Sequence, residues 1–218
     1  MQVLIPVFAF ILAVIIVLLI VIPSTADVDR LHTQTVQEKA SEEQENAERV
    51  SAGAENNTAT ESTDSTINDF FQQYYRAMAD GDVTQMDAMF DQEGYAVTSS
   101  ALDSLIDSFE NIRVYTAPGL KENEIAAFVY SDVKFANIDT SAPSVESFYL
   151  TKESGEPKIM TSMYSDAYIA EYLTLLSEKA PIKSIMDNTE YWLATTLKTD
   201  TGLKEIYDKM QDYIAGRE

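Results

Sequence analysis

The stretch that decides the fold is Phe70–Asp91, FFQQYYRAMADGDVTQMDAMFD. Together with Ile67 it carries apolar side chains three and four residues apart, which is the spacing of one helix face and predicts a helix over Ser65–Ala79. Gly81 suits the position just after a helix, and Asp82 suits the N-cap of the next one. The second, short helix would carry Val83, Met86, Met89 and Phe90 on its apolar side.

The aspartates of this stretch also raise the hypothesis of a cation-binding loop. Asp80, Asp82 and Asp91 stand at the first, third and twelfth positions of a twelve-residue window. An EF-hand calcium loop requires glycine at its sixth position, where this chain has Gln85. The spacing of Met86 and the apolar residues after it requires a helix through the same window. We therefore predict a helix–break–helix here and no metal site.

The overall composition excludes several classes of function. The chain has 218 residues, a formal net charge of −21 and no cysteine, and its single histidine is His32. Disulfides, thiolate chemistry and multi-histidine metal sites are therefore excluded. Lys and Arg are not clustered, so nucleic acid is not an expected partner. Because the sequence has no glycine-rich phosphate-binding or dinucleotide-binding motif, no cofactor is predicted.

An uncharged apolar segment, Val3–Ile22, stands near the N-terminus. A helix of this length spans about 30 Å, the thickness of the hydrocarbon core of a bilayer. We interpret residues 1–23 as an uncleaved transmembrane anchor, because the apolar run is longer than that of a signal peptide and no Lys or Arg precedes it. The alternative is a signal peptide that is cleaved after Ala26, which would make the protein secreted.

The orientation of the anchor is predicted from the residues that come after it in the chain. The long acidic part of the chain is typical of exported material, so we expect a single-pass protein of the plasma membrane with its domain outside. Arg30 and Lys39, taken alone under the positive-inside rule, favour the opposite orientation. The lack of cysteine in an exported protein indicates a bacterial cell envelope.

Residues 24–66 have the composition of an acidic linker or stalk. They contain ten acids, three bases and no Phe, Trp or Tyr. Such a segment buries too little apolar surface to offset the entropy of ordering it, although its first half is rich in helix formers. All twelve tyrosines, Trp192 and seven of the nine phenylalanines lie beyond it. The folded core is therefore expected to begin near Ile67.

The remaining chain has the pattern of further helices and an antiparallel sheet. The pattern predicts a third helix over Ser99–Asn111, then strands within IRVYTA, EIAAFVYSDVKFANI, VESFYLTK and PKIMTSMY, with a hairpin at Gly155. Helices resume after Asp166 and continue as a C-terminal extension, residues 165–218. Each of these helices has one apolar face, which either packs on the domain or binds a partner helix. Helices followed by an antiparallel meander define the α+β class.

Two features together resemble the nuclear-transport-factor-2-like superfamily, whose cone-shaped fold packs helices into a strongly curved antiparallel sheet. They are YYRAMADGD with the short helix VTQMDAMF, and the later run of long strands. The segment VYSDVKFANIDTSAPSVESFYLTKESGEP further resembles uncharacterised, membrane-tethered proteins of Gram-positive bacteria with this fold. The resemblance covers residues 67–164 and implies a cone-shaped α+β domain there.

The resemblance leaves the activity open, because this superfamily includes enzymes as well as binding modules. Its isomerases use a carboxylate base with Tyr or protonated Asp donors, and the acids and tyrosines that invite comparison are Tyr74, Tyr75, Tyr130, Asp132 and Tyr149. None of these stands in a recognisable catalytic motif, so we assign no catalytic or ligand-binding residue.

We expect a non-enzymatic binding or scaffolding module anchored through residues 3–22, with protein partners or a small apolar ligand. The alternatives are an isomerase- or dehydratase-like enzyme that uses the cone as its pocket, and a subunit of a conjugation or type IV secretion complex. A deep pocket with a buried carboxylate beside a Tyr hydroxyl would favour the enzyme, whereas a cone filled by Phe, Met and Trp would exclude it.

Overall fold

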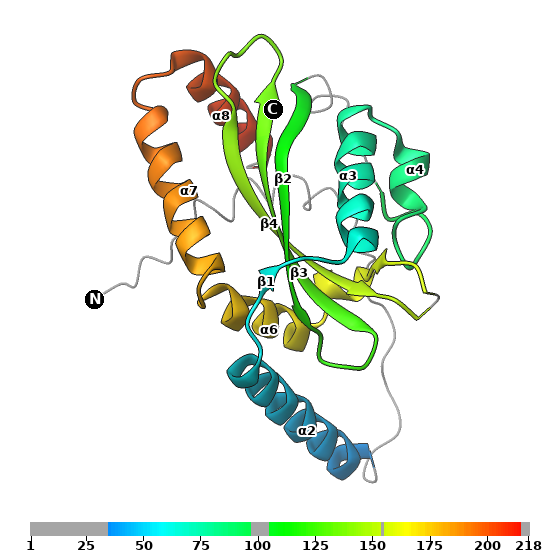
Figure 1. Cartoon of the computed structure of the whole chain (residues 1–218). Coiled ribbons are helices and arrows are strands. Elements are labelled where there is room, and N and C mark those ends of the chain that lie inside the picture. Colours follow the sequence, from blue (N-terminus) through cyan, green and yellow to red (C-terminus); the bar gives the residue numbers. More distant parts are fainter. Residues whose placement is uncertain (1–34, 97–104, 154, 215–218) are drawn as a thin grey trace, which may run out of the picture.

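The computed structural model describes residues 35–96, 105–153 and 155–214 (Figure 1). The predicted anchor at residues 3–22 and the alternative cleavage site after Ala26 lie outside the described residues. Within the described part of the chain, no helix combines the length and the apolar character that crossing a bilayer requires.

The centre of the fold is a curved antiparallel sheet of five strands in the order β1-β2-β3-β4-β5 (Figure 1). The strands are β1 Thr60–Glu61, β2 Ile106–Pro118, β3 Glu124–Phe135, β4 Ala142–Thr151 and β5 Lys158–Ile159. Val129 pairs with Glu146 and Ser131 pairs with Ser144, so these four side chains share one face of the sheet, which we call the inner face. Phe128 and Tyr130 point to the opposite, outer face, as the alternation in the sequence predicts. The α+β class is confirmed.

The predicted helix–break–helix is confirmed as α3 Ser65–Ala79 and α4 Val83–Asp87, but α4 ends before Met89 and Phe90, which the prediction places on it. Gly81 has φ +65°, a conformation that glycine adopts without strain. The Asp82 carboxylate accepts a hydrogen bond from the backbone N–H of Gln85 at 2.9 Å and so caps α4. α3 lies on the inner face, where the rings of Phe71 and Tyr74 contact Phe148 at centroid distances of 4.9 and 5.5 Å.

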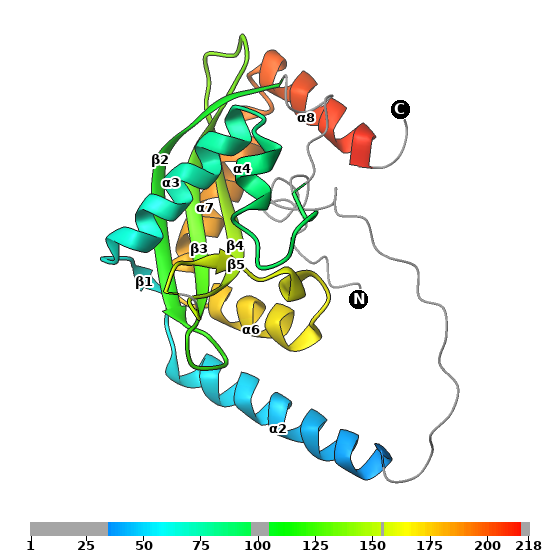
Figure 2. The same cartoon turned by 90° about the vertical axis from the view of Figure 1, so that its right-hand side faces the viewer.

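The C-terminal helices are α6 Ala167–Ser177, α7 Ile182–Thr196 and α8 Thr201–Ile214. The Asp166 carboxylate caps α6; the sequence leaves the cap open between Ser165 and Asp166. α6 and the start of α7 pack on the outer face, and α7 runs beside β4 (Figure 2). α8 buries its apolar face against the inner face, through Leu203, Ile206, Tyr207 and Met210. The apolar stripe of α8 is therefore used for packing on the domain rather than left for a partner helix.

The predicted linker over residues 24–66 needs correction in its second half. Helix α2 Thr35–Asn56 packs against α6, and Val50 and Ala54 are buried there. Gly53 allows this approach, because a Cβ at that position would stand 3.1 Å from the Tyr172 ring. Strand β1 then adds an edge to the sheet beside β2. A few small apolar residues are sufficient for docking because the partner helix α6 supplies the aromatic surface.

The helix predicted over Ser99–Asn111 is wrong for its described part. Ile106 and the residues after it form the start of β2, while residues 99–104 lie outside the described residues. Two register irregularities, at Ile106/Ser108 and Glu110/Arg113, break the strict alternation that would have revealed a strand. Of the predicted strand PKIMTSMY, only Lys158–Ile159 is a strand, and Thr161–Tyr164 forms a short 3-10 helix, η1.

Candidate functional site

A belt of buried polar side chains crosses the middle of the inner face. Ser131 and Ser144 face each other on β3 and β4, and Glu146 follows on β4 with its side chain on the same face. Tyr75 of α3 lies near Glu146, and its hydroxyl is close enough to influence the pKa of that carboxyl. The exposed fractions are 0% for Ser131, 1% for Tyr75, and 2% for Ser144 and for Glu146. We call these four residues the polar belt.

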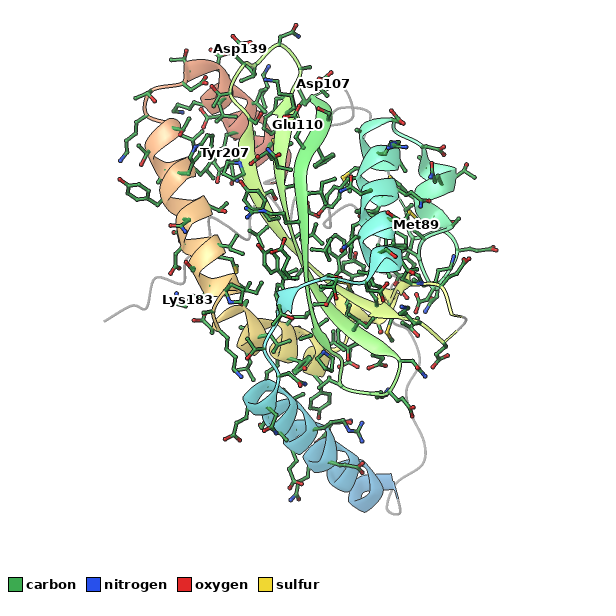
Figure 3. The ribbon with its side chains drawn as sticks, viewed as in Figure 1. Met89, Asp107, Glu110, Asp139, Lys183 and Tyr207 are labelled. Carbon is green, nitrogen blue, oxygen red and sulfur yellow. The ribbon has the colours of Figure 1, made fainter. Side chains whose placement is uncertain are left out.

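The polar belt separates two apolar clusters on the same face. On one side, α3 and α4 pack against Val129 and Phe148; on the other, α8 packs against Val133 and Ala142. Figure 3 shows that the two clusters lie apart: Met89 of the first lies beside α3 and α4, and Tyr207 of the second lies on the other side, near α7 and β4. Each covering helix therefore has its own apolar contacts, and the belt lies where the two clusters meet.

The oxygen atoms of the polar belt lack hydrogen-bond partners among the described residues. They are the Tyr75 hydroxyl, Ser131 Oγ, Ser144 Oγ and both carboxyl oxygens of Glu146. The Tyr75 hydroxyl influences the carboxyl without reaching hydrogen-bond geometry. A buried polar group without a partner costs about 1–3 kcal/mol, more if it is charged, so folded proteins rarely contain several together. Such a cluster is completed either by ordered water or by a bound ligand.

Burial raises the pKa of Glu146 from 4.5 to about 8, and the Tyr75 hydroxyl opposes part of that rise. No Lys, Arg or His among the described residues compensates the charge of Glu146. Burial likewise raises the pKa of Tyr74, Tyr75 and Tyr164, and the nearby Glu146 adds to this rise. At neutral pH the site therefore holds one mostly protonated carboxyl group among neutral phenols.

Aromatic rings form the walls around this carboxyl. Tyr74 and Tyr75 meet edge to face at a centroid distance of 5.4 Å, and Tyr75 lies 4.8 Å from Phe109 of β2. Tyr164 of η1, which stacks on Tyr95 at 6.3 Å, completes the aromatic set near Glu146. The site thus combines one ionisable acid with several π-faces.

The five residues compared with catalytic acids and tyrosines in the sequence fall into two groups. Tyr74 and Tyr75 lie at the polar belt, close to Glu146. Tyr130 and Asp132 lie on the outer face, where the Tyr130 hydroxyl donates to the Asp132 carboxylate at 2.6 Å and Arg113 lies over the Tyr130 ring. Tyr149 donates to Glu124 at 2.7 Å and accepts from the backbone N–H of Leu120. These three side chains have partners of their own and are not brought to Glu146.

Sequence reasoning missed Glu146 itself. The signal is the alternation in β4, because Glu146 occupies a position of the same parity as Ser144, Phe148 and Leu150. An acid at an inward position of an otherwise apolar strand face is unusual, since carboxylates are almost never fully buried without a partner. Applying to β4 the alternation that is evident in β3 would have found it.

Three aspartates of the opening stretch, Asp82, Asp87 and Asp91, accept hydrogen bonds from backbone N–H groups. Asp87 accepts hydrogen bonds from the backbone N–H groups of Gly94, Tyr95 and Ala96, at 2.8, 2.8 and 3.0 Å, and these bonds lower its pKa. Asp91 accepts from the backbone N–H of Thr161 at 2.9 Å. In the described ranges, His, Asp and Glu side chains form no group of three or more arranged to hold a metal ion.

A second feature is a cleft of about 460 Å³ between α3, α4 and the hairpin that joins β4 to β5. Its polar lining includes Asp69, Gln73 and Gln85, whose side chains are at least partly exposed. Because these groups are already solvated, the cleft has less need of a ligand than the polar belt.

Comparisons with protein-family models, with curated proteins and with solved structures give no match for this chain. The described residues establish an α+β protein with a curved antiparallel sheet.

Proposed function

We propose that this chain is a binding module, held outside the bacterial plasma membrane by residues 3–22, which captures a small ligand at the polar belt. The proposal includes the cone-shaped fold of the nuclear-transport-factor-2-like superfamily, with α3 in the hollow of the sheet. The observation that carries it is the set of buried, unpartnered oxygens around Glu146. A ligand that satisfies them gains hydrogen bonds in a site already shielded from water.

Ligand capture is favoured over docking of a protein through an apolar surface. Among the described residues the exposed large hydrophobic side chains are Val83, Leu175 and Tyr191, and they belong to three different helices. They do not make the contiguous apolar patch that marks many docking surfaces. Protein partners at the cell envelope would accordingly bind through polar contacts. A role within a conjugation or secretion complex stays a prediction on which the site has no bearing.

The second candidate function is an enzyme that moves a proton. A general acid or base works best when its pKa lies near the working pH, and Glu146 has a pKa of about 8. A Tyr hydroxyl beside a buried carboxyl is one part of the arrangement expected of an isomerase- or dehydratase-like enzyme, and a deep pocket is the other part. Turnover of a ligand by the wild-type protein, lost in Glu146→Gln, would support the enzyme over the binding module.

The binding function is tested by ligand-induced thermal stabilisation of the full chain in lipid nanodiscs. A small-molecule library is screened against the wild type, Glu146→Gln and Glu171→Gln, which removes an exposed carboxylate of α6. We expect ligands that stabilise the wild type and Glu171→Gln but not Glu146→Gln. Ligands that stabilise all three proteins equally would show that binding occurs elsewhere and would refute the site.

The orientation is tested separately on whole cells. The chain has no cysteine, so Ser51→Cys places a single thiol on an exposed position of α2. We expect a membrane-impermeant maleimide to label this variant in intact cells. Labelling that requires lysis of the cells would place the domain inside and contradict the proposal.

A further inference from the structure

We infer that the polar belt binds a small organic cation, a primary or substituted amine, with the Glu146 carboxylate as its counter-ion. This inference rests on the proposed binding function and names the chemical class of its ligand. It follows from three features, namely the chemical identity of the unpartnered atoms, the aromatic rings near Glu146 and the net negative charge of the chain.

All the unpartnered atoms of the polar belt are oxygens. Carboxylate oxygens only accept hydrogen bonds, and the hydroxyls of Ser131, Ser144 and Tyr75 accept as readily as they donate. An ammonium group brings several N–H donors and no acceptor, so it complements such a set. It also supplies the positive charge that no Lys, Arg or His of the described chain contributes to Glu146.

The aromatic walls fit a cation as well. Tyr74, Tyr75 and Tyr164 all lie near enough to Glu146 for its charge to raise their pKa values. A cation over an aromatic face gains about 0.5–2 kcal/mol, with the larger values in desolvated sites. A neutral ligand would gain the apolar contact but not this electrostatic part.

The negative charge of the molecule favours cations over anions as ligands. Figure 3 shows Asp107, Glu110 and Asp139 at the same end of the sheet, and all three side chains are exposed. The whole chain carries a formal charge of −21. Acidic surroundings of this kind raise the local concentration of positive ligands and exclude anionic ones.

Binding of a cation should be linked to release of a proton from Glu146. The titratable groups that face the carboxyl are Tyr74 and Tyr75 from α3 and Tyr164 from η1, while β3 and β4 contribute serines. Burial raises the pKa of each tyrosine further from neutrality, so Glu146 is the group that changes charge between pH 6 and 9. Affinity for the cation is then expected to rise about 50-fold from pH 6 to pH 8 and to level off above it.

The test measures binding of ethylammonium chloride and tetramethylammonium chloride to the full chain by isothermal titration calorimetry. Nanodiscs of zwitterionic phosphatidylcholine avoid binding of the probes to anionic lipid, and acetamide serves as the neutral probe. Titrations at pH 6, 7, 8 and 9 and constant ionic strength compare the wild type with Glu146→Gln, Ser144→Ala and Glu171→Gln.

We expect the cations to bind the wild type and Glu171→Gln with this pH dependence, to bind Ser144→Ala several-fold more weakly, and not to bind Glu146→Gln. A wild-type measurement covers the case in which Glu146→Gln fails to fold: the carboxyl ¹³C resonance of Glu146 should titrate near pH 8 and shift to a lower midpoint in saturating ethylammonium. Preference for acetamide, with affinity that falls above pH 8, would overturn the amine while leaving the binding site intact. Calorimetric binding that is equal in Glu146→Gln would overturn both the amine and the proposed site.

Discussion

Replacing Glu146 by Gln should change how the stability of the protein depends on pH. The carboxyl is fully buried, and burial raises its pKa from 4.5 to about 8. The folded state therefore binds a proton more tightly than the unfolded state does. The contribution of this group to the free energy of unfolding is fully present below its unfolded pKa of 4.5. It decreases as the pH rises from 4.5 to about 8 and does not change further above pH 8.

The magnitude comes from the same two values. Each unit of pKa difference corresponds to about 1.4 kcal/mol, so the full loss is about 5 kcal/mol and the part between pH 5.5 and pH 8.5 is about 3 kcal/mol. Small domains are stable by only about 5–15 kcal/mol, so this loss is readily measurable. Acids with a lowered pKa, such as Asp64 and Asp87, titrate below this window and do not interfere.

The assay is urea unfolding of the full chain in detergent, followed by fluorescence of Trp192, the only tryptophan. The wild type and the control Glu171→Gln should lose about 3 kcal/mol of unfolding free energy from pH 5.5 to pH 8.5, and Glu146→Gln should lose much less. Histidine titrates in the same window, but His32 is common to all three proteins, so it cancels in the comparison. Equal slopes in the wild type and Glu146→Gln would refute the assignment of a buried, proton-binding carboxyl.

Three further predictions concern the docking of α2 and the turn that follows α4. Lys179→Met removes the ammonium that donates to the carbonyls of Ala54, Glu55 and Asn57, and should destabilise the docking of α2 by about 1–3 kcal/mol. Amide hydrogen exchange in α2 should be faster in this variant than in the wild type, and unchanged in the control variant Lys183→Met. Asp87→Asn should lower the midpoint of thermal unfolding at pH 7. The difference between wild type and variant should become smaller as the pH falls below 3.8, because the carboxylate has a lowered pKa in the folded state and its stabilising effect is lost on protonation. Gly53→Val should separate α2 from α6, because a Cβ at this position already meets the Tyr172 ring. Proteolysis of α2 should then be faster while the sheet stays intact. An unchanged rate of digestion would contradict this prediction.

Local patterns in the sequence were sufficient wherever a few adjacent residues fix the structure. The helix over residues 65–79, the break at Gly81 and the cap at Asp82 follow from periodicity, backbone freedom and a single side-chain hydrogen bond, all within one or two helical turns. The same holds for a cap at Ser165 or Asp166 and for the alternation in β3.

Tertiary contacts decided the rest. Ile106 and Phe109 have a spacing that fits a helix, but their pairing with Phe135 and Val133 makes them part of a strand. The docking of α2 depends on Tyr172, more than a hundred residues further along the chain.

Glu146 shows the difference most clearly. In the sequence it is one acid among 36 acidic residues, and its position in β4 fixes only which face of the strand it occupies. Its burial requires that α3, from a distant part of the chain, covers that face and brings Tyr75 close to the carboxyl. Desolvation is a property of everything that surrounds a group, so the raised pKa, and with it the candidate site, exists only in the folded chain.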